Sequence, residues 1–278
     1  MSDHAHPTSE LQEISRRLQV AMEIQWILRD ESGLSPVAAL KRAAESRVVP
    51  AAAPRRPSPA ARVEAASSPS SAAPPPAATV IQPWQNDPAR FASLDELHET
   101  YQACLRCELG KTRKNFVFGV GSPKARVMFI GEAPGRDEDL QGEPFVGAAG
   151  QLLTKILGAV DFKREDVYIA NILKCRPPGN RDPQPEEIAA CEPILRRQIE
   201  LIQPLVLCTL GAFAARTMLG VNSGISRLRG RVHDYRGIPL VPTYHPAALL
   251  RNASWKRPTW EDVQLLRREY DRLAKTES

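Results

Sequence analysis

The chain has 278 residues, of which 42% are hydrophobic and 25% are charged, and its formal net charge is +5. No run of about 18 apolar residues occurs, which argues against a transmembrane helix, and the polar first ten residues lack the apolar core of a secretion signal. We therefore expect a soluble cytoplasmic protein. Residues 1–89 carry nine basic and nine acidic side chains, so all of the excess positive charge lies in residues 90–278. A polyanion such as DNA fits this distribution, although a charge of this size can also serve solubility alone.

The N-terminal segment, residues 1–48, is predicted to be helical. Apolar side chains recur at helical spacing over residues 9–31, and Ser9 with Gln12 can form a capping box. A short second helix is expected over residues 35–45. The segment is too small to bury a core alone. It either docks another protein or folds back onto the main domain, and the pattern favours neither alternative.

A linker is expected over residues 49–89. Its first 30 residues, 49–78, include 11 Ala, 8 Pro and 5 Ser. Such a composition cannot bury enough apolar surface to offset the entropy of the chain, which predicts disorder. The third unit, residues 90–278, is then the folded domain.

The pattern of the folded domain predicts an α/β protein. Apolar, β-rich runs occur at residues 126–131, 167–173, 205–210 and 239–244. Helical stretches are expected at residues 92–103, 148–160, 185–202, 211–219 and 258–275. Alternation of this kind predicts a three-layer α/β/α sandwich with a short, mainly parallel four-stranded sheet. In such sheets the active site forms beyond the carboxyl ends of the strands.

Residues that follow the predicted strands are therefore the candidates for chemistry. Glu132 lies in a Gly- and Pro-rich turn after the first strand, and Phe145 lies in the next loop. Asn171 interrupts the apolar second strand, and its amide either is satisfied internally or reads a ligand. His245 follows the last strand and precedes an apolar loop that ends in Arg251. Each of these residues could instead have a purely structural role, which for Phe145 is that of an anchor in the hydrophobic core.

The cysteines suggest a metal site. Cys104 and Cys107 form a C-x-x-C pair, and Cys175 and Cys191 follow at longer intervals. Four such residues can bind zinc or an iron–sulfur cluster, and spacing alone leaves both open. Cys208 lies within an apolar strand and is expected to be a core residue.

Three stretches closely resemble family 4 uracil-DNA glycosylases. They are GEAPGRDEDLQGEPFVGAAGQLL from Gly131, NILKCRPPGNRDP from Asn171 and HPAALLRN from His245. The resemblance covers roughly residues 91–270 and extends to the order and spacing of four cysteines. It implies the uracil-DNA glycosylase fold and an enzyme that hydrolyses the N-glycosidic bond of flipped-out deoxyuridine to start base excision repair. It also implies a structural 4Fe–4S cluster held by Cys104, Cys107, Cys175 and Cys191.

The resemblance also implies roles for individual residues. Glu132 would stabilise the cationic sugar and orient water, as carboxylates do in glycoside hydrolysis. His245 would donate to uracil O2, with the backbone N–H of Ala133 as a second donor. Phe145 would stack on the uracil ring, and Asn171 would read its N3–H and O4 edge.

Further roles concern selectivity and DNA contact. Glu138 lies where the family is thought to crowd the C5 position of the ring and exclude thymine. Leu249 would be the wedge that enters the minor groove, and Arg251 would hold phosphate or support the loop. The stretch from Arg227 to Arg236 carries four arginines, which either contact phosphate or form a solvated face.

Three alternative functions are considered. One branch of the superfamily captures uracil covalently through a histidine on an inserted basic loop, but no such insert follows Pro178, which favours turnover. The protein could instead act mainly through interaction, with residues 9–31 recruiting it to a protein partner. It could also act on another deaminated base such as hypoxanthine or xanthine. A monomer that binds uracil-containing DNA, single- or double-stranded, is expected.

Overall fold

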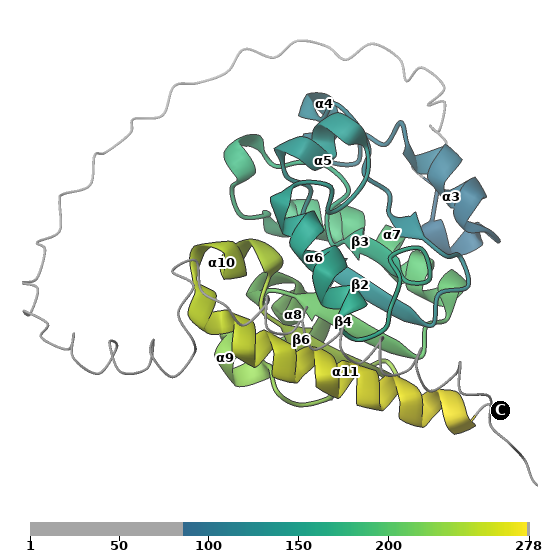
Figure 1. Ribbon diagram of the computed structural model, residues 1–278. Coiled ribbons are helices and arrows are strands. Elements are labelled where there is room, and N and C mark those ends of the chain that lie inside the picture. The colour runs from purple at the N-terminus through teal and green to yellow at the C-terminus, as the bar shows by residue number, and fades with distance from the viewer. Residues whose placement is uncertain (1–85, 277–278) are drawn as a thin grey trace, which may run out of the picture.

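The computed structural model describes residues 86–276 (Figure 1). The predictions for residues 1–48 and for most of the linker concern residues outside this range. Among the described residues, no helix combines the length and the apolar character needed to cross a membrane.

A six-stranded mixed sheet forms the centre of the molecule, with strand order β1-β3-β2-β4-β6-β5. The strands are β1 (Val120–Gly121), β2 (Val127–Gly131), β3 (Tyr168–Asn171), β4 (Val206–Leu210), β5 (His233–Tyr235) and β6 (Ile238–Thr243). The four inner strands are parallel, whereas β1 and β5 pair antiparallel at the two edges. The predicted α/β class is confirmed, and the predicted runs correspond to the four inner strands.

The prediction of only four strands was wrong, because both edge strands are short. β1 has two residues, too few to produce an alternating pattern. β5 joins β6 through a tight hairpin at Arg236 and Gly237, which have φ values of 53° and 87°. Positive φ at both central residues is typical of a type I′ turn, which suits the twist of paired strands. Arg-Gly is a weaker signal for this turn than Asn-Gly.

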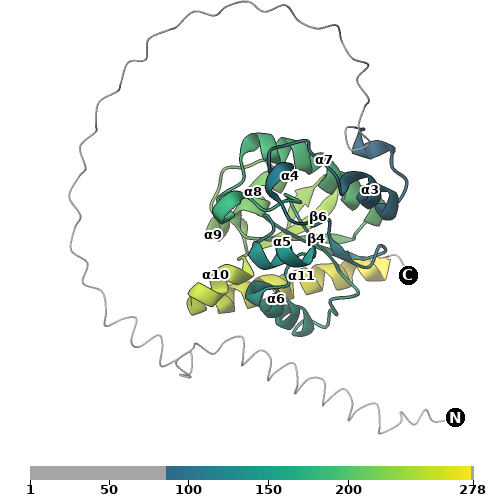
Figure 2. The ribbon, with the colours of Figure 1, turned by 90° about the horizontal axis from the view of Figure 1, so that it is seen from above.

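Helices cover both faces of the sheet (Figure 2). The longer ones are α3 (Leu94–Tyr101), α6 (Ala148–Gly158), α7 (Pro185–Ile202), α8 (Ala212–Leu219) and α11 (Lys256–Thr276), close to the predicted ranges. Shorter helices are α4 (Leu109–Thr112), α5 (Arg136–Gln141), α9 (Ile225–Leu228) and α10 (Pro246–Arg251). Three 3₁₀ turns are η2 (Pro88–Arg90), η3 (Pro178–Asn180) and η4 (Ala253–Trp255).

Two hydrophobic layers sandwich the sheet because successive strand residues face opposite sides. In β2, Met128 and Ile130 join the layer that includes residues of α3, α7 and α8. Val127 and Phe129 join the layer that includes residues of α6, α10 and α11. β2 and β4 are buried along their whole length, as expected for parallel strands covered on both faces.

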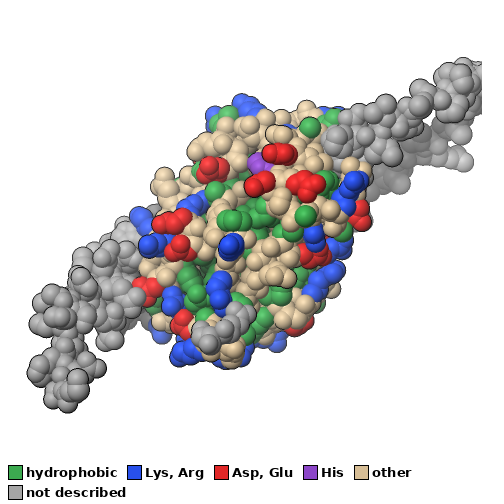
Figure 3. Space-filling model, turned by 90° about the vertical axis from the view of Figure 1, so that its right-hand side faces the viewer, with side chains coloured by type: hydrophobic (Ala, Val, Ile, Leu, Met, Phe, Trp, Pro, Cys, Tyr) green, Lys and Arg blue, Asp and Glu red, His purple; other side chains and the backbone are tan. Residues whose placement is uncertain are grey.

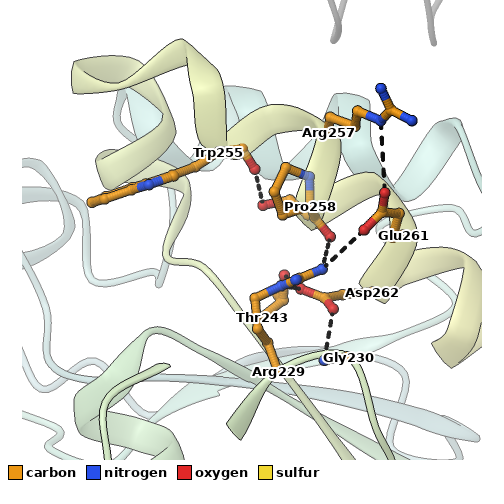
Figure 4. A network of polar contacts seen from close by, with 9 residues as sticks. Arg229, Gly230, Thr243, Trp255, Arg257, Pro258, Glu261 and Asp262 are labelled. Carbon is orange, nitrogen blue, oxygen red and sulfur yellow. Dashed lines mark hydrogen bonds and ion pairs between the residues drawn. The ribbon is translucent and has the colours of Figure 1, made fainter. Parts of the chain in front are cut away.

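A buried carboxylate fixes α11 against the end of β6 (Figure 4). The Asp262 side chain is 0% exposed. It accepts hydrogen bonds from Arg229 Nε (2.8 Å), Thr243 Oγ1 (2.8 Å) and the Gly230 backbone N–H (3.0 Å). Thr243 lies two residues before His245, so this network anchors the strand end from which His245 emerges.

Arg229 belongs to this network and not to a free basic surface. Its guanidinium also donates to the Pro258 carbonyl and lies 3.5 Å from the Glu261 carboxylate. It sits 5.8 Å from the ring centroid of Tyr244, which stacks on Trp255 with centroids 4.8 Å apart. For Arg229, therefore, the structure supports neither sequence-based alternative.

Charge is mixed on the side of the molecule remote from α10. Figure 3 shows Lys and Arg side chains interspersed with Asp and Glu there, around scattered hydrophobic ones. This face therefore does not present the continuous positive surface that a phosphate backbone favours.

Candidate functional site

A cavity of about 630 Å³ opens at the carboxyl ends of the parallel strands. This size is typical of pockets for small organic groups. The predicted site residues that line it are Glu132, Ala133, Glu138, Phe145, Asn171, His245 and Arg251. Three separate strand ends supply Glu132, Asn171 and His245, as expected for a parallel sheet.

Several lining residues were not identified from the sequence. They are Pro134, Gly135, Arg136, Asp137, Gly147, Ala148, Ala149, Pro177, Asn180, Arg181 and Ala247. All lie within or beside the three motif stretches. One sequence signal could have identified four of them, because each is a polar residue that follows a Pro-Gly turn at 134–135 or 178–179. These four are Arg136, Asp137, Asn180 and Arg181. Arg181 also forms a bidentate pair with Glu187 of α7.

Glycines permit the close packing around Phe145. A Cβ atom on Gly131 would lie 2.3 Å from Asn171 Oδ1 and 2.7 Å from Phe145 Cζ, so β2 must end in glycine. A Cβ atom on Gly150 would lie 1.7 Å from the Phe145 carbonyl oxygen. Phe145 itself has φ 55°, a backbone conformation that bulky residues rarely adopt. Its ring centroid lies 5.5 Å from that of His245.

Glu138 holds this loop in place. Its carboxylate accepts hydrogen bonds from the backbone N–H groups of Val146 (3.0 Å), Gly147 (3.1 Å) and Gly135 (3.1 Å). These contacts tie the Phe145 loop to the start of α5 and give Glu138 a positioning role. The expectation that it crowds the base ring stays a prediction.

Asn171 lines the pocket and has an amide oxygen without a partner among the described residues. Its side chain is 2% exposed, and Oδ1 has no hydrogen-bond partner among the described residues. A buried polar atom left unpaired costs about 1–3 kcal/mol. Of the two alternatives from the sequence, a ligand-reading amide is therefore favoured over internal satisfaction.

His245 is partly buried, and its ring is neutral at physiological pH. Burial lowers its pKa to about 4, with the Arg251 charge acting in the same direction and Glu138 opposing it. As the N-cap of α10, it accepts a hydrogen bond from the Ala247 N–H on Nδ1 (3.1 Å). The proton of the neutral ring is therefore on Nε2, which can act as a donor.

The pKa of Glu132 is shifted in the opposite direction, upward. Burial raises the pKa of its carboxyl group, the nearby charge of Asp182 raises it further, and Arg216 lowers it. The pocket thus pairs a neutral imidazole donor with a carboxylate that is costly to ionise. Opposite shifts of this kind are typical of catalytic sites.

Helix α10 contains two adjacent leucines, and the sequence predicts that the first, Leu249, is the DNA wedge. Leu249 is 1% exposed and packs in the hydrophobic layer with α6 residues, whereas Leu250 is 45% exposed. Leu249 is thus a core side chain in the DNA-free structure, and its role as the wedge stays a prediction. Arg251, the next residue, is exposed at the pocket edge.

The four cysteines of the predicted metal site share one layer of the core. Cys104, Cys175 and Cys191 are buried there, and the partly exposed Cys107 packs against them. Cys208 is buried in the opposite layer, which confirms its expected place in the core. Segments distant in sequence thus bring four thiols to one region beside the end of β3.

Burial keeps two of these cysteines protonated in the absence of a metal. Burial raises the pKa of Cys175 to about 12 and that of Cys191 to about 11, so neither ionises at neutral pH without a strong counter-charge. Arg113 Nη1 donates to Cys175 Sγ and the Arg106 N–H to Cys104 Sγ, both at 3.5 Å. In the described range no three ligands converge as they do around a single ion. A 4Fe–4S cluster does not require this, because each thiolate binds a different iron.

Comparisons with known proteins agree on one family. A model described as the uracil DNA glycosylase superfamily matches residues 118–265. A type-4 uracil-DNA glycosylase of Archaeoglobus fulgidus is 50% identical over 166 residues, which is 57% of this chain and 83% of that protein. The type-4 enzyme of Thermotoga maritima is 45% identical over 62% of this chain and 91% of its own length. A type-5 uracil-DNA glycosylase of Thermus thermophilus is 30% identical over 46% of this chain and 67% of its own length.

Glu132→Gln is expected to raise the melting temperature at pH 8. The folded state raises the pKa of this carboxyl group, so its contribution to stability is present at low pH and is lost as the pH rises through the folded pKa. The difference from wild type should shrink as the pH is lowered toward 4. Thermal unfolding across this pH range measures it, with the exposed Glu165→Gln as control. A Glu132→Gln variant no more stable than wild type at pH 8 would contradict the analysis.

Proposed function

This chain belongs to the uracil DNA glycosylase superfamily as a type-4 uracil-DNA glycosylase, and we propose how its pocket releases uracil from DNA. The observation that carries the proposal is the buried, unpaired amide oxygen of Asn171, a residue that lines the same cavity as His245, Phe145 and Glu132. Uracil N3–H is the donor that this oxygen lacks. The activity hydrolyses the N-glycosidic bond and starts base excision repair.

The base reaches the pocket by flipping out of the helix. Chemistry at the glycosidic bond requires this, at a cost of a few kcal/mol of unstacking. Phe145, whose ring is held by its loop, then stacks on the uracil. Asn171 accepts from N3–H and donates from Nδ2 to O4. Cytosine has an acceptor at N3 and an amine at C4, so it would leave the buried amide mismatched at about 1–3 kcal/mol for each lost pair.

Cleavage of the glycosidic bond leaves negative charge on the uracil and positive charge on the sugar. His245 would act on the first and Glu132 on the second. His245, neutral and protonated on Nε2, donates to uracil O2 as negative charge accumulates there. The backbone N–H of Ala133, a residue that lines the pocket, would be a second donor. Glu132 as a carboxylate stabilises the positive sugar and orients the attacking water. No separate general acid is needed if the uracil anion is held in this way.

DNA contact falls to the loop that follows His245. We assign the wedge to Leu250 because it is the exposed leucine of α10, and we place Arg251 beside the phosphates at the pocket edge. An apolar side chain inserted at a base step occupies the space that the flipped base leaves.

Cys104, Cys107, Cys175 and Cys191 would hold a 4Fe–4S cluster. When bound, it would cross-link the segment between α3 and α4, the loop after β3, and α7. The loop after β3 also contributes Pro177, Asn180 and Arg181 to the pocket, so the cross-links would stabilise the pocket wall.

Glu132→Gln, Asn171→Ala and His245→Ala should each lower the rate of uracil release by about 10²- to 10³-fold. The assay incubates each protein with an oligonucleotide containing one uracil, cleaves abasic sites with alkali and measures strand breakage. Glu165→Gln is the control and should act as wild type. The wild-type rate should fall in acid as the raised pKa of Glu132 is passed, without a break near pH 6.5 from His245. A shift of intact DNA in a denaturing gel would instead establish covalent capture.

Cys175→Ala should abolish iron binding, whereas Cys208→Ala should not affect it. Both thiols are buried, but only Cys175 lies among the other cysteines. Iron content by elemental analysis and the visible absorbance of the purified proteins give the comparison. Equal iron in both variants, or zinc in place of iron, would refute the cluster proposal.

Leu250→Ala should slow uracil release from duplex DNA by on the order of tenfold, or about 1.4 kcal/mol. Single-stranded DNA has no vacated stack to fill, so its rate should change little. Val221→Ala is the control, because Val221 is similarly exposed at 41% but lies outside the pocket. Equal losses on both substrates would reject the wedge.

A further inference from the structure

Arg164 is a partly buried cation to which the proposed mechanism gives no role. It lies in the segment between α6 and β3, 20 residues after Pro144 in the sequence. Its Nη2 donates to the Pro144 backbone carbonyl at 2.7 Å. Its Nη1 is buried and has no hydrogen-bond partner among the described residues. An unpaired buried donor is costly, and an apolar side chain would avoid this cost but would leave the Pro144 carbonyl unbound.

The Pro144 carbonyl belongs to the peptide bond that leads into Phe145. The orientation of this peptide plane is set by ψ of Pro144 and φ of Phe145, so a hydrogen bond to the carbonyl restricts both torsions. Phe145 has φ 55°, a conformation that bulky residues rarely adopt and that surrounding contacts must enforce. Arg164 therefore acts directly on the strained torsion of the residue whose ring lines the pocket.

Other contacts hold Phe145 from its far side. The Glu138 carboxylate accepts from the backbone N–H groups of Val146 at 3.0 Å and Gly147 at 3.1 Å. The Phe145 carbonyl packs so closely on Gly150 that a Cβ atom there would lie 1.7 Å from it. These contacts act on the chain after the Phe145 Cα atom, whereas Arg164 holds the peptide before it. The strained residue is thus clamped on both sides.

Arg267 of α11 makes contacts of the same kind with a different target. Its side chain is also partly buried, and its Nη1 donates to the backbone carbonyls of Val160 at 3.0 Å and Asp161 at 3.2 Å. These carbonyls follow the end of α6 and lie outside the Phe145 loop. The chain therefore offers two arginines that bind backbone carbonyls, of which Arg164 acts on the loop that carries Phe145.

We propose that Arg164 is a positioning residue that fixes the Phe145 ring as the platform on which uracil stacks. It acts through Phe145 and is not itself among the residues that line the cavity. Stacking is present in the bound substrate as well as in the transition state, so loss of Arg164 weakens binding more than it slows the chemical step. This inference rests on the proposed function, because it concerns the ring proposed to stack on the base.

The experiment is a double-mutant cycle of Arg164→Met and Phe145→Leu on the full chain. KM and kcat are measured on a single-stranded oligonucleotide containing one uracil, together with inhibition by free uracil. Each single variant should raise KM and the inhibition constant about tenfold, a loss typical of base stacking, while kcat changes much less. Because Arg164 acts through Phe145, the double variant should also lose about tenfold. A loss of about a hundredfold, the product of two independent effects, would overturn the proposal.

Arg267→Met is the matched control. It removes two carbonyl contacts and should lower the melting temperature, as Arg164→Met does, but should leave KM, kcat and inhibition by uracil unchanged. If Arg164→Met does not fold, Arg164→Gln takes its place in the cycle, since the shorter side chain also loses the Pro144 contact. An Arg164 variant with the KM of wild type, or an equal rise of KM in Arg267→Met, would contradict the proposed role.

The same measurements separate this inference from the function on which it rests. A wild type that releases no uracil from DNA would refute the proposed function. A wild type that is active and is inhibited by free uracil, but shows no coupling between Arg164 and Phe145, would refute only the role of Arg164.

Discussion

The parallel pairing of Gly131 with Asn171, at the carboxyl ends of β2 and β3, is the contact on which the pocket depends. With no side chain on Gly131, the Asn171 amide and the Phe145 ring can both approach the end of β2. The same constraint explains why a loop with a strained residue is tolerated nearby, since Glu138 and Gly150 hold Phe145 where the glycine leaves room. A single added methyl group at Gly131 would displace both of the groups expected to bind the base.

Burial shifts the pKa values of His245 and Glu132, the two groups proposed to be catalytic, in opposite directions. It keeps His245 neutral and so able to donate, and it raises the pKa of the Glu132 carboxyl group, so that ionising this group is costly. Both states reduce folding stability, as does the unpaired oxygen of Asn171. Such costs concentrate where binding or catalysis uses them, and the substrate supplies the missing partners.

Two buried charged groups outside the pocket are hydrogen-bonded, and their bonds link the site to the rest of the fold. Asp262 of α11 joins Arg229 and Thr243 beneath the strand end that carries His245. Lys174 occupies the corresponding position behind Asn171, where its side chain donates to the Asn171 carbonyl and to Gln198 of α7. The two strand ends are therefore supported by different hydrogen-bond networks.

The sequence by itself determined the four inner strands, the five longer helices and seven of the residues that line the pocket, because apolar periodicity and turn residues are local signals and these seven residues lie in motifs that follow strands directly. It could not show the edge strands, which are too short for a periodic pattern. It could not show which of Leu249 and Leu250 faces the core, since adjacent leucines look alike until α6 packs against one of them. The protonation of His245, the pairing of Arg229 with Asp262 and the loop contacts of Glu138 were decided only by the tertiary structure. Each depends on burial or on a partner that the sequence pattern does not specify, and these arise only when the chain folds.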